Sequence, residues 1–94
     1  MDKKIELLND YNECQKKINT FTINNYKEYE NWANKKYDEW LAKDKDFIPF
    51  SPQNGFIPPQ SDIESSMNTL RNFKNILLEN MIKKGIDVRK NNNF

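Results

Sequence analysis

The sequence contains no histidine and only one cysteine, Cys14. Without histidine the chain lacks the commonest general base and the commonest side-chain ligand of transition metals. A single cysteine excludes an internal disulfide, a Cys/His nucleophile pair and a standard zinc site. We therefore expect a non-enzymatic protein with no catalytic residues, no cofactor and no metal ion.

Phosphate-binding loops and membrane segments are missing as well. The chain has only two glycines in 94 residues, and neither a GxGxxG nor a GxxxxGK motif occurs. No apolar run reaches the roughly 7 to 15 residues of a signal-peptide core or the ~18 residues of a membrane span. These absences predict a protein of the cytoplasm, or of the host cytoplasm if a phage encodes it.

Charge of one sign is not in excess, because 15 Lys and Arg face 14 Asp and Glu and leave a net charge of +1. Nucleic-acid-binding domains usually show a clustered basic excess. A protein partner or a second copy is therefore favoured, and a small helical nucleic-acid-binding regulator is the alternative. Phosphate contacts would then come from these basic residues: Lys27, Lys35, Lys36, Lys83, Lys84, Arg89 and Lys90.

Two amphipathic helices are predicted in the first half of the chain. Apolar residues recur every three or four positions and indicate helices over about 3–19 and 25–44. The first stripe runs from Leu7 to Phe21 at heptad spacing. The second stripe is aromatic and consists of Tyr26, Tyr29, Ala33, Tyr37 and Trp40.

The junction TFTINN, residues 20–25, admits two interpretations. Asn25 and Glu28 have the spacing of a capping box, which would begin a new helix. Alternatively, the apolar spacing continues from Ile18 to Tyr26 with one extra four-residue step, as in a stutter. Because no Pro or Gly enforces a break, the spacing favours one continuous or merely kinked helix.

The last helix has clear start and stop signals. An SxxE capping pattern begins at Ser61, and the apolar periodicity that follows predicts a helix over about 62–84. Gly85 supplies the left-handed residue that ends a helix, and Ile86 can pack back as in a Schellman motif. Residues 87–94 are expected to form a polar, flexible tail.

The connection over 46–61 contains all four prolines and no charged residue between Phe47 and Gln60. It is longer than the roughly two to eight residues that usually join helices in a bundle. We expect it to reverse the chain, so that the flanking helices are antiparallel neighbours. Its apolar residues either cap the core or form a docking surface.

A last helix running back from this connection covers the aromatic stripe first and leaves the stripe from Leu7 to Phe21 bare. Either the first segment folds back onto it, or another chain covers that stripe. The fold class predicted is therefore all-α, a helical hairpin or a small three-helix bundle in one domain over 1–86, with dimerisation as one way to complete the core.

The sequence favours a protein-interaction module that self-associates or that binds and modulates a larger protein. The fifteen Asn and thirteen Lys residues, which have A/T-rich codons, suit a phage or mobile-element accessory protein such as an inhibitor. The candidate interface residues are Leu7, Tyr11, Ile18, Phe21, Trp32, Leu41, Phe47, Phe50, Phe56 and Ile57.

Overall fold

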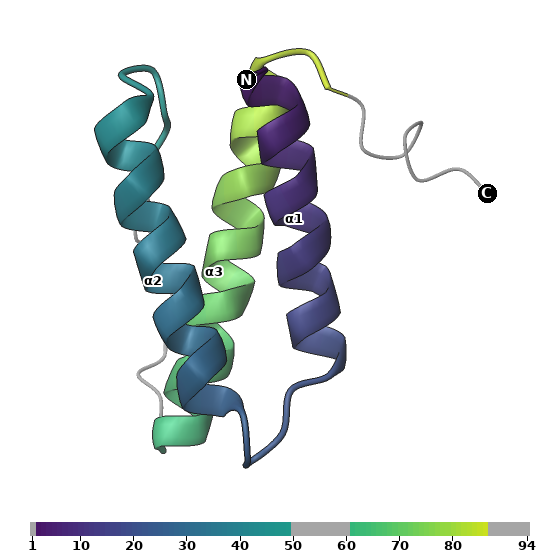
Figure 1. The fold of residues 1–94 in the computed structure, drawn as a ribbon, viewed down its shortest axis with the longest axis vertical. Helices are drawn as coiled ribbons and strands as arrows, with labels where there is room; N and C mark the ends of the chain where they lie inside the picture. Colours follow the sequence, from purple (N-terminus) through teal and green to yellow (C-terminus); the bar gives the residue numbers. More distant parts are fainter. Residues whose placement is uncertain (1, 50–60, 87–94) are drawn as a thin grey trace, which may run out of the picture.

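The computed structural model describes residues 2–49 and 61–86. It contains three helices, α1 (Lys3–Asn19), α2 (Tyr26–Lys43) and α3 (Asp62–Lys83), and no strand among the described residues. The helices lie side by side along a common long axis (Figure 1). The predicted all-α class is confirmed, and of the two architectures considered the three-helix bundle is the one observed.

The order of the helices in space differs from the hairpin that the sequence suggested. Glu30 near the start of α2 accepts a hydrogen bond from Ser66 near the start of α3, at 3.1 Å. At the other end Asp44 follows α2 and lies 3.3 Å from the ammonium of Lys84. Helices α2 and α3 are therefore parallel, and α1 runs antiparallel to both (Figure 1). The expected antiparallel pairing of α2 with α3 is wrong, because the helix that packs antiparallel to α3 is α1.

A turn over residues 20–25 separates α1 from α2, so the continuous helix favoured by the spacing is wrong. The Asn25 side chain accepts the Thr22 amide at 2.7 Å and donates to the Thr20 carbonyl at 2.9 Å. The Thr22 hydroxyl accepts the amide of Asn24. Such local side-chain bonds compete with helical ones. Asn25 is thereby used in the turn, and its side chain makes no cap bond to α2.

Helix α3 is the centre of the core, because it packs against both α1 and α2. The N-terminal stripe is covered by the same chain, with Leu7 fully buried and Tyr11, Ile18 and Phe21 partly buried against the core. The first segment therefore folds back. The buried apolar residues are Leu7, Cys14, Ala33, Trp40, Phe47, Leu70, Phe73, Ile76, Leu77 and Met81.

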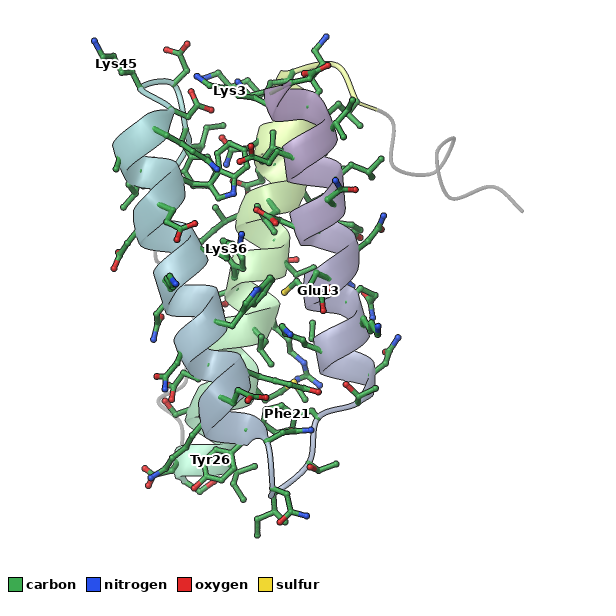
Figure 2. The ribbon with its side chains drawn as sticks, in the orientation of Figure 1. Lys3, Glu13, Phe21, Tyr26, Lys36 and Lys45 are labelled. Atoms are coloured by element: carbon green, nitrogen blue, oxygen red, sulfur yellow. The ribbon has the colours of Figure 1, made fainter. Side chains whose placement is uncertain are left out.

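The interface between α1 and α2 is more polar than the contacts of either helix with α3. Asp10 is 7% exposed and accepts the indole N–H of the fully buried Trp40 at 2.8 Å. Lys36 reaches from α2 to within 3.8 Å of the same carboxylate (Figure 2). From α1, the Lys17 ammonium lies 5.0 Å from the centre of the Trp32 ring. Directional polar contacts thus join α1 and α2 across the bundle.

Both end signals of α3 are confirmed. The Ser61 hydroxyl accepts the amide of Glu64 at 3.2 Å, as an N-cap residue does. Gly85 has a φ of +81°, and the amide of Ile86 donates to the Met81 carbonyl at 2.9 Å. This is the Schellman arrangement, and Ile86 packs against the core as expected.

Candidate functional site

A clamp on α3 fixes the chain where it leaves α2. The fully buried Asn80 accepts the Ile48 amide at 2.7 Å and donates to the Ile48 carbonyl at 3.1 Å. Its amide nitrogen also donates to the Ile76 carbonyl at 2.8 Å. One turn on, Lys83 donates to the Asp46 carbonyl at 2.7 Å. Hydrogen bonds from two side chains of α3 to the backbone of residues 46 and 48 therefore hold this segment against the helix.

Phe47 belongs to the core and not to a docking surface. It is 6% exposed, and its ring stacks on Trp40 with centroids 5.5 Å apart and planes 12° apart. Tyr37 meets the same ring edge-on at 6.3 Å. For this residue the core-cap interpretation holds. The other loop residues proposed as interface, Phe50, Phe56 and Ile57, lie outside the described residues.

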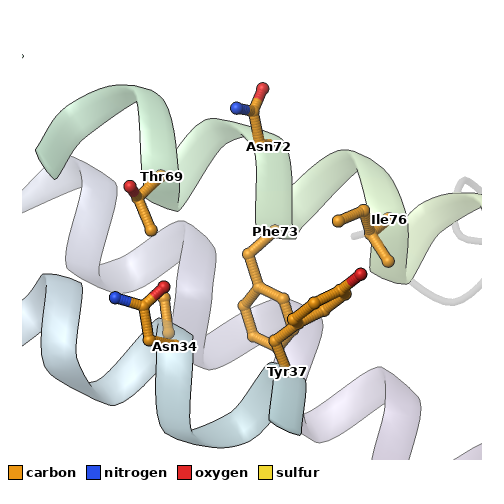
Figure 3. Close-up of a pocket in the computed structure, with 7 residues that line it drawn as sticks. Asn34, Tyr37, Thr69, Asn72, Phe73 and Ile76 are labelled. Atoms are coloured by element: carbon orange, nitrogen blue, oxygen red, sulfur yellow. The ribbon is translucent and has the colours of Figure 1, made fainter. Parts of the chain in front are cut away.

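A cavity of about 150 Å³, here called the α2–α3 pocket, lies between those two helices (Figure 3). The rings of Tyr37 and Phe73 lie next to each other in the space between the helices, and Asn34 and Thr69 lie further along it. Ala33 and Ile76 add apolar lining. No charged side chain is among the described residues that line it. These are Ala33, Asn34, Tyr37, Thr69, Asn72, Phe73 and Ile76.

The size of the α2–α3 pocket restricts what it can hold. An apolar cavity of about 150 Å³ accommodates a molecule the size of benzene. Pockets for cofactors and drug-sized ligands usually measure about 300 to 1,000 Å³. The α2–α3 pocket therefore matches one apolar side chain. Leu41, which is 43% exposed, lies one turn beyond Tyr37 on the same face of α2 and extends the apolar surface.

Trp32, a predicted interface residue, packs partly against the core, and its part in an interface stays a prediction. It is partly buried and meets Phe73 edge-on with ring centroids 5.7 Å apart, while Lys17 covers its other side. At the turn end of the bundle, Phe21 and Tyr26 are neighbours at 6.5 Å (Figure 2). Of the predicted interface residues that the structure describes, Leu41 is the one classed as exposed.

The lysines proposed for nucleic-acid contacts are not gathered on one surface. Lys36 is paired with Asp10 and, at 3.9 Å, with Glu39. Lys27 lies in the first turn of α2, whereas Lys84 follows the last turn of α3 at the opposite end of the bundle. Lys35 is exposed on α2, and Lys83 donates a hydrogen bond to the Asp46 carbonyl beyond the end of α2. Arg89 and Lys90 lie outside the described residues.

Asp44 joins the ends of all three helices. It is 3% exposed, accepts the Asp46 amide at 3.0 Å and lies 3.3 Å from Lys84 and 3.8 Å from Lys3. Burial by itself raises the pKa of this carboxyl, but the Asp46 amide and the Lys84 ammonium outweigh it, so the pKa lies below its ordinary value of 3.8. The carboxylate is therefore charged at neutral pH and is neutralised by Lys84 and Lys3 at this end of the bundle.

The reactive side chains that do occur are arranged for packing. Cys14 is fully buried, its thiol donates to the Leu70 carbonyl at 3.2 Å, and burial raises the pKa of the thiol to about 12. Among the described residues, no three Cys, Asp or Glu side chains are grouped so that they could hold a metal ion. None of the described helices combines the length and apolarity needed to cross a bilayer.

Comparisons of the chain with protein-family models, with curated proteins and with solved structures found no match.

Proposed function

We propose that this protein works by binding another protein, and that the α2–α3 pocket receives one apolar side chain of that partner. The observation that carries the proposal is an uncharged hollow of about 150 Å³ between two helices. Anchors of this kind, a side chain inserted into a desolvated pocket, contribute most of the binding energy at many protein interfaces.

The lining favours a protein side chain over a nucleotide. A nucleotide would carry phosphate groups, which need Lys, Arg or backbone donors nearby. The polar side chains of the described lining are Asn34, Asn72, Thr69 and Tyr37, all uncharged, and the Thr69 hydroxyl already donates to the Ser65 carbonyl. A neutral rim around an apolar floor is the usual anatomy of a protein contact.

Composition supports an accessory role for this binding. The sequence contains no histidine, the commonest general base, which suits a protein that modulates a larger one by binding it. An inhibitor encoded by a phage or mobile element is one such protein. Self-association would use apolar side chains that the bundle leaves exposed: Ile5, Ile23, Leu41, Ile63 and Ile82.

Site-specific photo-crosslinking tests the proposal in cells that naturally produce the chain. A photoreactive amino acid replaces Asn34, which is exposed at the pocket, or Asn12, an exposed residue of α1 that serves as the matched control. We expect a protein adduct from position 34 and none from position 12. Equal adducts from both positions, or none, would contradict the proposal, and an adduct removed by nuclease would support the nucleic-acid regulator instead.

A pocket-filling substitution gives the second arm. Ala33→Leu places a larger apolar side chain where the partner's side chain is proposed to bind, and Ala42→Leu makes the same change at an exposed position of α2. Circular dichroism first verifies that both variants fold. We expect Ala33→Leu to reduce the adduct from position 34 by roughly tenfold or more, because a hot-spot contact is lost, and Ala42→Leu to leave it unchanged.

A further inference from the structure

The turn between α1 and α2 contains none of the residues that usually force a chain to reverse. Residues 20–25 include no Gly and no Pro, and no residue among them has a positive φ. Thr20 has φ −111° and ψ 14°, and Asn25 has φ −127° and ψ 1°, which place both in the bridge region between extended and helical backbone. Both ends of the turn can therefore become helical without leaving the region of negative φ.

Side chains hold this turn closed, and Asn25 contributes most. Its amide bonds the backbone on both sides, to Thr22 at 2.7 Å and to Thr20 at 2.9 Å. The Thr20 hydroxyl adds a bond to the Lys16 carbonyl at 3.0 Å. At the centre of the turn, Ile23 is 69% exposed, the most exposed large apolar residue of the described chain. Asn25 thus links both ends of the turn, beside the Asn25 amide bond to the Thr22 carbonyl at 3.2 Å and the Thr20–Tyr29 hydroxyl contact at 3.0 Å. The closed turn leaves the apolar Ile23 in water.

If residues 20–25 become helical, α1 continues the axis of α2 and leaves its own α3. A helix from residue 3 to 43 would be roughly 60 Å long. A second copy related by a two-fold axis can then supply its α1 to the vacated surface, and every contact of α1 forms again between chains. The two long helices cross at their turns, which brings the two Ile23 side chains toward each other.

We propose that Asn25 keeps this chain in the closed bundle, and that the occupant of the α1-binding surface of α2 and α3, once the turn straightens, is α1 of a second copy. We choose α1 as the occupant because its side chains already fit this surface. Leu7 and Cys14 are fully buried there, and Asp10 accepts a hydrogen bond from the indole N–H of Trp40. This exchange goes beyond the proposed partner binding and does not use the α2–α3 pocket.

The test compares Asn25→Ala with Asn24→Ala after unfolding and refolding at high protein concentration. Asn24 is an exposed residue of the same turn whose side-chain amide takes part in none of the hydrogen bonds of the described chain, so it controls for composition. Light scattering over a dilution series gives the dimerisation constant. In the wild type, forming one exchanged dimer breaks the Asn25 hydrogen bonds of two turns, whereas Asn25→Ala has no such bonds to lose. We therefore expect Asn25→Ala to raise the dimerisation constant roughly 100-fold or more, and Asn24→Ala to leave it near the wild-type value.

Cross-linking then distinguishes exchange from simple surface contact. In a Cys14→Ala background, Glu6→Cys and Lys43→Cys replace the two ends of an ion pair between α1 and α2. A short bismaleimide joins two chains in the exchanged dimer and one chain to itself in the closed bundle. Joined chains on a denaturing gel support the proposal, whereas an Asn25→Ala dimer linked only within chains overturns it.

Blocking the long helix completes the design. Ile23→Pro in the Asn25→Ala background should return the protein to its monomeric mass of 11.3 kDa, because Pro breaks a helix interior. If circular dichroism shows that this variant is unfolded, two glycines inserted after Ile23 serve instead. A monomeric Asn25→Ala protein at all concentrations, or a dimer that survives both hinge changes, overturns the proposal.

Discussion

Replacing Asn80 with Ala should destabilise the bundle more than any other single truncation of a polar side chain. Asn80 is fully buried and bonds both backbone groups of Ile48, at 2.7 and 3.1 Å. Alanine leaves an amide and a carbonyl without partners in a partly buried place. It also releases Ile48 from α3, while Lys83 still holds the Asp46 carbonyl, and it loosens the cover of Phe47, which is otherwise 6% exposed.

The magnitude follows from these two groups. A buried backbone group that loses its hydrogen bond costs about 1 to 3 kcal/mol, so two such groups cost about 2 to 6 kcal/mol, and their partial exposure puts the loss near 3 kcal/mol. A domain of this size has a total stability of about 5 to 15 kcal/mol. A loss of 3 kcal/mol lowers the melting temperature by roughly 12 to 24 °C at the usual 4 to 8 °C per kcal/mol.

Urea unfolding followed by circular dichroism at the helical band measures the change. Asn75→Ala is the matched control, because Asn75 is exposed on the same helix and gains the same helix propensity. We expect the control to be neutral or slightly stabilising. A loss of less than about 1 kcal/mol for Asn80→Ala, within the range of an ordinary exposed site, would refute the view that Asn80 holds the chain after α2.

Two further predictions concern titratable groups. The pKa of Asp44 is lowered in the folded chain, so its contribution to the free energy of unfolding is present above the ordinary value of 3.8 and is lost as the pH falls through the lower folded value. The free energy of unfolding measured from pH 7 to 2 should therefore fall less steeply in Asp44→Asn than in the wild type. Parallel curves for the two proteins would contradict this. Because burial raises the pKa of Cys14 to about 12, iodoacetamide at pH 8 should modify the thiol only after urea unfolds the chain, and rapid labelling of the folded protein would show that the helix pair opens.

The helices could be predicted from the sequence because their signals are local. Periodic apolar residues place each helix, and the cap at Ser61 and the stop at Gly85 depend on neighbours only a few positions away. The turn at 20–25 was harder, since Asn25 offers one side chain to two competing uses. In the structure its side chain bonds Thr20 and Thr22 and does not cap α2. The spacing of residues in the sequence does not distinguish these two uses of Asn25.

The parallel arrangement of α2 and α3 was missed although its signal was present. An antiparallel pair needs only about two to eight connecting residues, whereas a parallel pair needs a connection as long as the helix itself. Helix α2 has 18 residues, which is roughly 27 Å, and the eleven residues 50–60 can extend to about 36 Å. The unusual length of this connection therefore indicated a crossover between opposite ends of the bundle.

Buried polar residues also carried a signal, because they lie on the apolar stripes. Asp10 is three residues after Leu7, and Asn80 is three residues after Leu77, so both positions face the core. Their partners, Trp40 and Ile48, are 30 and 32 residues away along the sequence. The sequence alone can therefore mark such positions as exceptions on a stripe but cannot supply the partner.

These exceptions explain why one arrangement of three similar helices prevails. Apolar burial is non-directional, so the stripes of α2 and α3 would pack in either orientation. Buried polar groups must each find a partner, and here Ser66 bonds Glu30 at one end of the pair while Asn80 bonds Ile48 at the other. Reversing α3 would separate both pairs and leave buried groups unsatisfied. We infer that these two contacts, set in an apolar core that tolerates both orientations, select the parallel one and thereby form the face that carries the α2–α3 pocket.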